Sequence, residues 1–231
     1  MPAVVTFDIE TAAIDRERLE DFKHRFEPKP PEPEPAAEVE EEKPKKKKKL
    51  AKKEDRPKKL KSDRAGLHYL TGRVVCAGAK NFGKKAEMFA HEEEEILLAG
   101  LYEYLDNYRP FTLVTFNGRE FDVPFVYMRG LLHGFDFSQV LPMDKFSKSH
   151  IDLYQHLGGK WGMNGKLSEL AWHFGIEDGL DGSGADVQKN FDNGNWEEII
   201  AHCRADVETT EKLYIRLFPH GRIVSGKWSP R

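Results

Sequence analysis

The stretch Val4-Val5-Thr6-Phe7-Asp8-Ile9-Glu10-Thr11 begins with apolar and β-branched residues, which is typical of a short buried strand. Successive side chains on a strand point to opposite faces, so Asp8 and Glu10 share one face and the apolar residues beside them share the other. Two neighbouring carboxylates repel each other and are costly to bury unless a cation lies between them. The stretch is therefore either an edge strand with solvated acids or half of a metal site.

The chain of 231 residues is long enough for one domain with its own core. No apolar run approaches the ~20 residues needed to cross a bilayer, and no signal peptide precedes Pro2. We therefore expect no membrane association. Cys76 and Cys203 are the only cysteines; they allow no disulfide framework and, without a close pair, make a poor zinc site. We expect a reducing, cytoplasmic compartment.

A strongly polar segment separates the first strand from the rest of the chain. Prolines, like charges and a lack of apolar residues predict that Pro28 to about Arg64 is a disordered insertion. Residues 43–64 hold thirteen Lys or Arg against three acids; because the whole chain carries −3, the remainder carries −13. A basic block on an acidic body can hold a polyanion near a carboxylate-lined site. The block is either such a tether for nucleic acid or a solubilising or localisation tract.

The remaining sequence predicts strands followed by strands alternating with helices. We expect strands over 4–11, 70–79, 84–90, 112–116 and 150–153, and helices over 14–26, 92–108, 123–132, 166–174 and 196–218. This order predicts an α/β fold, with a sheet of mixed strand direction flanked by helices.

A second acidic position follows the predicted strand 112–116. Asn117-Gly118 is typical of a turn, which puts Asp122 at the start of the next helix and near the carboxyl end of a strand. Ligands of open α/β sheets bind at such strand ends. The alternative is an acid that only complements the helix dipole.

The third position lies on the long closing helix. His202 and Asp206 are four residues apart, so they project together beside the apolar stripe of this helix. A surface hydrogen bond between the two side chains is the alternative to a catalytic pair.

Together the three positions resemble the motifs of the DEDD, or DnaQ-like, 3′–5′ exonucleases. The nearest group is the exonuclease related to the proofreading domain of family B DNA polymerases. The stretches that carry the resemblance are Phe7-Asp-Ile-Glu-Thr11, Phe116-Asn-Gly with Phe121-Asp-Val-Pro-Phe125, His150-Ile-Asp-Leu153, Lys166-Leu-Ser-Glu-Leu170 and the helical acid Asp206. The resemblance covers nearly the whole chain outside 28–64. It implies a single exonuclease domain over 1–231, interrupted by the insertion, with a ribonuclease H-like fold.

The resemblance also implies a metal site. It makes Asp8, Glu10, Asp122 and Asp206 the acids that bind two Mg²⁺ or Mn²⁺ ions, roughly 3.5–4 Å apart, on either side of the scissile phosphate. In the family, either a Tyr four residues before the last Asp or a His five residues before it lies beside the attacking water. This chain has His202 at the Tyr spacing, which leaves open whether it orients the water or takes its proton.

Further candidates have more ordinary alternatives. Thr11, Asn117 and Phe121 are candidates for substrate contacts, with core packing as the alternative for Phe121. Asp152 is either an outer acid of the metal site or a structural residue at a strand end.

The resemblance predicts a metal-dependent exonuclease that releases nucleotides from 3′ ends of single-stranded DNA. RNA trimming by the same chemistry is an alternative, because no residue visibly recognises or excludes a 2′-hydroxyl. A nucleic-acid-binding subunit that kept the fold and lost catalysis is another, although the presence of all four acids argues against it. The sequence contains no polymerase domain, so a role in proofreading, replication or repair requires a separate partner.

Overall fold

The computed structural model describes residues 3–26, 62–158, 165–177, 184–218, 222–224 and 227–229. Residues 28–61 of the predicted insertion lie outside this part of the chain. The last three residues of the predicted insertion, 62–64, are described and belong to the 3-10 helix η1 (Ser62–Leu67). Ala65 of this helix is buried and belongs to a small apolar cluster with Ile14 and Leu19.

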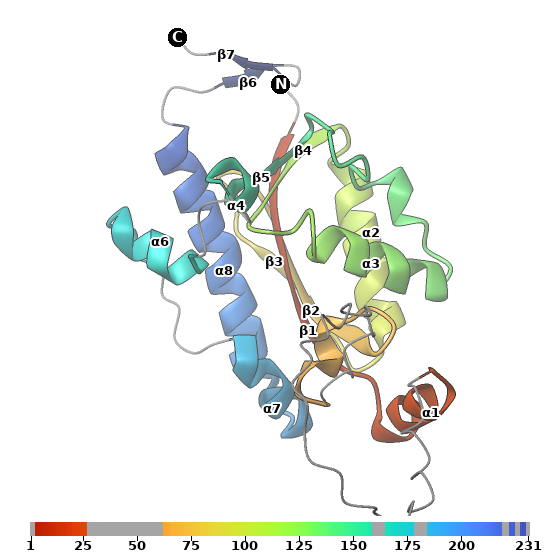
Figure 1. Ribbon diagram of the computed structural model, residues 1–231. Helices are drawn as coiled ribbons and strands as arrows, with labels where there is room; N and C mark the ends of the chain where they lie inside the picture. Colours follow the sequence, from red (N-terminus) through yellow and green to blue (C-terminus); the bar gives the residue numbers. More distant parts are fainter. Residues whose placement is uncertain are drawn as a thin grey trace, which may run out of the picture.

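A five-stranded sheet forms the centre of the molecule, with β1 in the middle (Figure 1). The strands are β1 (Ala3–Ala13), β2 (Gly72–Asn81), β3 (Glu87–Ala90), β4 (Phe111–Thr115) and β5 (His150–Asp152), in the order β3-β2-β1-β4-β5. β2 is antiparallel to β1 and β3, whereas β4 is parallel to β1 and β5. The predicted sheet of mixed direction is confirmed.

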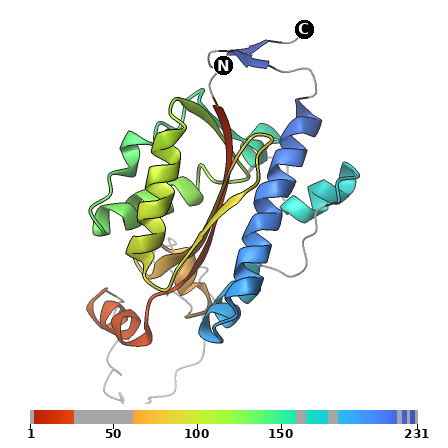
Figure 2. The same ribbon diagram turned by 180° about the vertical axis from the view of Figure 1, so that it is seen from behind.

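Helices cover both faces of the sheet, as Figures 1 and 2 show. α2 (Glu94–Asn107) and α3 (Asp122–Leu132) lie on one face, and α8 (Trp196–Leu217) lies on the other with α7 (Val187–Asp192) before it and α6 (Leu167–His173) outside it. The shorter elements are α1 (Arg16–Phe26), α4 (Leu153–His156), η2 (Phe137–Gln139) and η3 (Gly184–Asp186).

Two short antiparallel strands, β6 (Arg222–Val224) and β7 (Lys227–Ser229), were not predicted. No helix in the part of the chain described by the structure is long and apolar enough to span a membrane.

Each face of the sheet has its own apolar core. Phe7, Ile9 and Val74 pack with α2 and α3, whereas Val75 and Cys76 pack with α7 and α8. Val75 and Cys76 are consecutive, yet both face α7 and α8, because the pairing of β1 with β2 shifts register between them. Glu10 is opposite Cys76 and Thr11 is opposite Val74, so Val75 has no partner on β1. This β-bulge directs Cys76 toward the same side as α8, next to an acid of β1.

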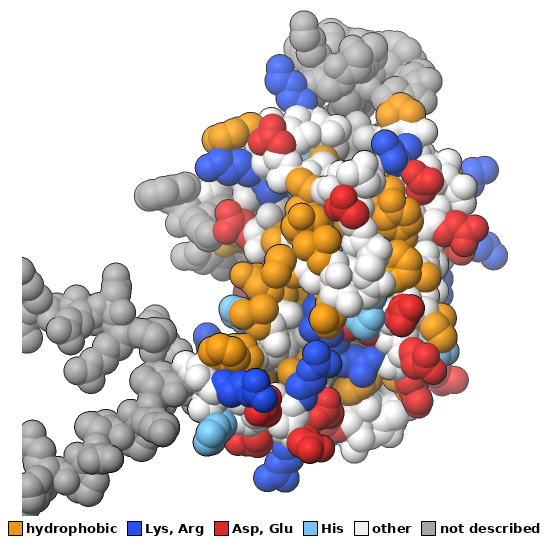
Figure 3. Space-filling model, turned by 90° about the vertical axis from the view of Figure 1, so that its right-hand side faces the viewer, with side chains coloured by type: hydrophobic (Ala, Val, Ile, Leu, Met, Phe, Trp, Pro, Cys, Tyr) orange, Lys and Arg blue, Asp and Glu red, His pale blue; other side chains and the backbone are white. Residues whose placement is uncertain are grey.

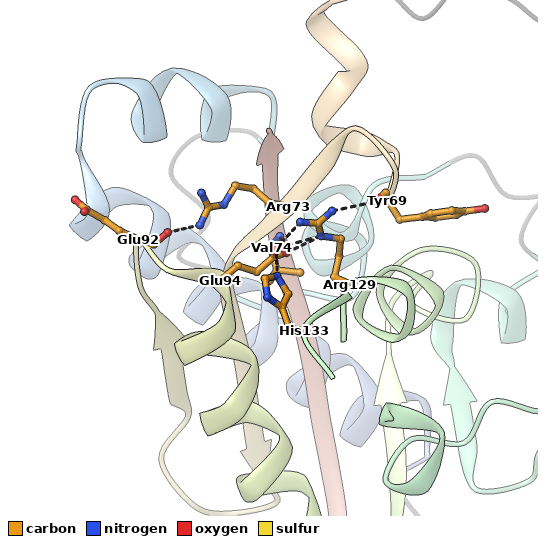
Figure 4. A network of polar contacts seen from close by, with 7 residues as sticks. All are labelled: Tyr69, Arg73, Val74, Glu92, Glu94, Arg129 and His133. Atoms are coloured by element: carbon orange, nitrogen blue, oxygen red, sulfur yellow. Dashed lines mark hydrogen bonds and ion pairs between the residues drawn. The ribbon is translucent and has the colours of Figure 1, made fainter. Parts of the chain in front are cut away.

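A buried ion pair between Glu94 of α2 and Arg129 of α3 fixes these two helices to β2, on the face of the sheet away from α8 (Figure 4). Glu94 accepts hydrogen bonds from Arg129 Nη2 at 2.5 Å and from the backbone N–H of Val74 at 2.7 Å. His133 Nε2 lies 3.0 Å from the same carboxylate, and Arg129 also reaches the carbonyl of Tyr69. Burial alone would raise the pKa of Glu94, but these donors hold it below its ordinary value. The network therefore keeps Glu94 ionised.

The outer side of this layer exposes several apolar side chains. Met128, Leu131 and Leu132 follow one edge of α3 at helical spacing and are 37%, 47% and 53% exposed. Figure 3, which views the molecule from the side of α2 and α3, shows hydrophobic side chains gathered among scattered charges.

Candidate active site

The candidate site begins where β1 and β4 part. Their parallel pairing covers Ala3 to Thr6, so the next residues of β1 have no β4 partner along this edge. The backbone N–H of Ile9 instead donates to Oδ1 of Asp122 at 3.0 Å. Asp122 is therefore held beside Asp8 and Glu10, although it is far from them in the sequence.

The connection from β4 to α3 delivers Asp122 through a tight turn. Asn117 adopts a left-handed conformation with φ 64°, and a Cβ added at Gly118 would lie 2.6 Å from Thr115 Cβ. The turn therefore needs a glycine at 118 and a residue that tolerates positive φ at 117. Asp122 is the first residue of α3 and is 4% exposed.

α8 brings the remaining side chains to β1. A Cβ at Gly78 would lie 2.7 Å from Val207 Cγ2 and 3.2 Å from Cys203 Sγ, so this glycine lets α8 approach the sheet closely. As a result, His202 Nε2 lies 3.7 Å from Glu10 Oε1 and 3.7 Å from Asp206 Oδ2. One ligand atom from each of these three residues lies within 4.8 Å of the others.

The acids of the site affect one another strongly. Burial, followed by the charges of the neighbouring acids, raises the pKa of Asp8 and of Glu10 well above their ordinary values. Burial raises the pKa of Asp122 to about 7, although the Ile9 N–H lowers it. Asp206 is one of the charges that raise all three. Four carboxylates therefore share one partly buried region.

The arrangement fits divalent cations. Carboxylate oxygens suit Mg²⁺ and Mn²⁺, and an imidazole nitrogen is a further ligand type for transition metals. His202 Nε2 is too far from the two carboxylates to hydrogen-bond, and its Nδ1 is buried with no partner among the described residues. A cation between these groups would relieve the repulsion that raises the pKa values of the acids.

The other candidates for substrate contacts differ in their surroundings. Thr11 is buried, at 8% exposed, directly after the register shift of β1. Asn117 is partly buried in the turn before α3. Phe121 packs against the main core, with its ring 5.4 Å from that of Phe125, which accords with its structural alternative. Their contacts with a substrate stay predictions.

The cysteines have a setting that their sequence spacing did not indicate. Cys203 Sγ lies 3.8 Å from the carbonyl oxygen of Asp8 and 3.9 Å from its Oδ2. Burial and a hydrogen bond with Cys76 raise the pKa of the Cys203 thiol. The two cysteines are thus a close pair in space, next to the acids, because the bulge of β2 and the helical face of α8 bring them together.

Comparisons with known proteins identify the family of the chain and proteins with a similar fold. Residues 72–227 match the family described as "Predicted 3′-5′ exonuclease related to the exonuclease domain of PolB". The curated DNA polymerase 1 of Sulfolobus acidocaldarius is 35% identical over 104 residues, which cover 40% of this chain and 11% of that protein. The structure of the family B DNA polymerase from Pyrobaculum calidifontis is similar with a TM-score of 0.61 and 16% identity, over 95% of this chain and 25% of that one. The chain thus spans only a small part of the length of these polymerases, and the structural likeness shows a shared fold.

Proposed function

Because the chain belongs to the family of predicted 3′–5′ exonucleases related to the exonuclease domain of PolB, we propose that it hydrolyses single-stranded DNA from its 3′ end with the help of two divalent cations. The observation that carries the proposal is the convergence of Asp8 and Glu10 of β1, Asp122 of α3 and Asp206 of α8. A protein that only bound nucleic acid would gain nothing from four clustered acids, two of them buried, that repel both one another and a phosphate.

Asp8, Glu10, Asp122 and Asp206 would hold the cations. Bound Mg²⁺ or Mn²⁺ offsets the charge of the phosphate and makes water a stronger nucleophile. The bond from the Ile9 N–H fixes Asp122 in one orientation, so this ligand needs little rearrangement when the cations and DNA bind.

His202 has the position of a group that acts on the attacking water. Its Nε2 faces Glu10 and Asp206, and an imidazole can accept a proton or orient a water molecule by hydrogen bonding. In the reaction, the water oxygen bonds to phosphorus, the bond from phosphorus to the 3′ oxygen breaks, and that oxygen is protonated. The products are a nucleoside 5′-monophosphate and a strand shorter by one nucleotide.

The choice of DNA rests on the polymerase relatives. RNA is the second candidate substrate, because no described residue of the site visibly excludes a 2′-hydroxyl. We also propose that the chain is one exonuclease domain interrupted by the segment at about 28–64, and that its partners are a polymerase or other replication or repair proteins.

The test is digestion of 5′-labelled single strands of DNA and RNA with Mg²⁺, with Mn²⁺ and with EDTA. We expect stepwise shortening from the 3′ end, faster for DNA, and none in EDTA. Asp8→Asn or Asp206→Asn should reduce the rate by orders of magnitude. Asp106→Asn, which changes an exposed acid of α2, is the matched control and should keep the wild-type rate. Wild-type activity in the Asp8 or Asp206 variant would contradict the two-metal assignment.

A further inference from the structure

Asp152, the last residue of β5, is buried and is not one of the four acids, although its charge is among those that raise the pKa of Asp122. It is 4% exposed, and its carboxylate accepts hydrogen bonds from three backbone N–H groups. Gln155 N–H donates to Oδ1 at 3.2 Å, which caps the short helix α4. The other two donors belong to the turn that carries Asp122: Asn117 N–H lies 3.0 Å from Oδ1, and Arg119 N–H lies 2.9 Å from Oδ2.

The side chain of Arg119 holds the same turn from the other direction. Its guanidinium donates to four carbonyl oxygens in the segment that leads into β5, those of Asp144, Lys145, Ser147 and His150. The turn and the segment 144–152 are therefore joined in both directions. The Asp152 carboxylate accepts hydrogen bonds from the turn, and the Arg119 guanidinium of the turn donates hydrogen bonds to the segment. Charge-assisted bonds of this kind are among the stronger hydrogen bonds of a protein, and those from Asn117 and Arg119 to Asp152 are partly buried.

The turn connects this support to Asp122. Asn117 adopts a left-handed conformation with φ 64°, which Asn tolerates better than most residues, and its N–H is one of the turn's two donors to Asp152. The turn also continues directly into α3, since Val123 N–H donates to the carbonyl of Gly118 at 2.9 Å. A shift of residues 117–119 would therefore move the start of α3, and with it Asp122.

We propose that Asp152 is a positioning residue that acts through the turn 117–121 to hold Asp122 against the Ile9 N–H of β1. The consequence for catalysis rests on the proposed function, whereas the effect on Asp122 does not. A purely local role would be different: an Asp152 that only caps α4 would have no influence on β1.

The first measurement is amide hydrogen exchange, followed by NMR on the full chain without metal. In Asp152→Ala we expect exchange at Ile9 to become roughly tenfold faster, the equivalent of about one hydrogen bond. Amides of β1 that pair with β2 serve as an internal reference. Faster exchange at Gln155, Asn117 and Arg119, with an unchanged rate at Ile9, would overturn the proposal.

Asp152→Asn keeps the fold testable if the alanine variant does not fold. The Asn side chain retains one oxygen, which can still accept from Asn117, but its NH₂ group cannot accept from Arg119. We expect a smaller acceleration at Ile9 than in the alanine variant. Leu19→Ala is the control for loss of stability alone, because it removes a buried side chain of α1 from the small cluster with Ile14 and Ala65, which contains no residue of the turn or of α3.

The second measurement links Asp152 to the proposed function. Mn²⁺ binding, followed by the EPR signal of the free ion, should weaken by about 10–100-fold in Asp152→Asn, the range found for residues that orient metal ligands. We expect kcat on single-stranded DNA to fall with little change in KM. If the wild-type protein binds no Mn²⁺ and cuts no strand, the proposed function is wrong, and the exchange rate at Ile9 still decides whether Asp152 positions Asp122.

Discussion

Asp122 is a carboxylic acid that the fold makes reluctant to ionise. Its pKa is about 7 in the folded protein, against about 4 for an unfolded Asp. Between these two values the folded state binds more protons than the unfolded state, so this group lowers the free energy of unfolding as pH rises. His150 acts in the opposite direction, because burial lowers its pKa to about 3. The contribution of Asp122 to the pH dependence of stability can therefore be measured only by comparing the wild type with a variant at this position.

We predict that Asp122→Asn stabilises the protein in EDTA and that its advantage grows as pH rises from about 4 to about 7. The reason is that the amide removes a charge which the folded state tolerates poorly. Urea unfolding of both proteins from pH 4.5 to 8 measures the difference in free energy, with Asp106→Asn as control. An advantage that is constant over this range would contradict the raised pKa.

His202 leads to a second prediction at the residue scale. If it takes a proton from water, His202→Ala should lose roughly 10²–10⁴-fold in the rate of cleavage, the range typical of general-base catalysis. His202→Tyr should recover part of that loss, because family members carry Tyr at this spacing, and it should remove any acid limb that belongs to imidazole. Single-turnover digestion from pH 5.5 to 9 with saturating metal compares the three proteins. Equal rates for wild type and the alanine variant would leave His202 without a role.

Two pairs of site residues could be predicted from the sequence to lie side by side, because the members of each pair are close together in the chain. Asp8 and Glu10 alternate on a strand, and His202 and Asp206 share one side of a helix. The positioning role proposed for Asp152 could not be inferred in the same way. It depends on backbone N–H groups of a turn more than thirty residues away in the chain, and no pattern of residue types reveals such bonds.

At the scale of elements, the position of α8 depends on the close contact of the helix with Gly78 of β2 and on the bulge of that strand. The predicted helices and strands are present, but the pattern of apolar residues did not reveal the bulge of β2 or the contact of Gly78 with Val207. Both features arise from pairing between distant segments, which hydrophobic periodicity does not encode.

The ion pair of Glu94 and Arg129 gives the prediction at this scale. Glu94→Gln or Arg129→Leu should lower the free energy of unfolding by about 3–5 kcal/mol, because each leaves a buried charge without its partner. The double variant should be less destabilised than the sum of the two single changes. Urea unfolding at pH 7 measures all three. Loss of the exposed pair of Asp106 and Arg109 should cost about 0–1 kcal/mol, and an equally small effect at Glu94 would contradict the role of the network.

At the scale of the whole molecule, charge is divided unequally along the sequence. The alternation of strands and helices was enough to predict the mixed sheet, and the basic residues of 43–64 were enough to suggest a partner with phosphates. What that basic block contacts cannot be predicted from composition, because a run of lysines is compatible with nucleic acid, another protein or solvent.

We predict that deleting residues 28–61 leaves the melting temperature nearly unchanged, because this sequence has few apolar residues that could be buried. If its lysines contact phosphates, binding of a single-stranded oligonucleotide should weaken, and the slope of log affinity against log salt should shrink by ~0.7 per lost contact. Fluorescence anisotropy at several salt concentrations measures the slope. A variant with Lys45–Lys49 changed to Gln is the matched control for chain length, and an unchanged slope would assign the block another role.

The bond from Ile9 to Asp122 joins residues 113 positions apart, and the contact of Cys203 with Asp8 spans 195. Contacts of such long range form late, since the chain must first lose the entropy of closing large loops. We therefore expect the four acids to meet only after the folding barrier has been crossed, in which case their repulsion affects the rate of unfolding rather than the rate of folding. A cation that binds the completed cluster would accordingly lengthen the lifetime of the folded protein without making it fold faster.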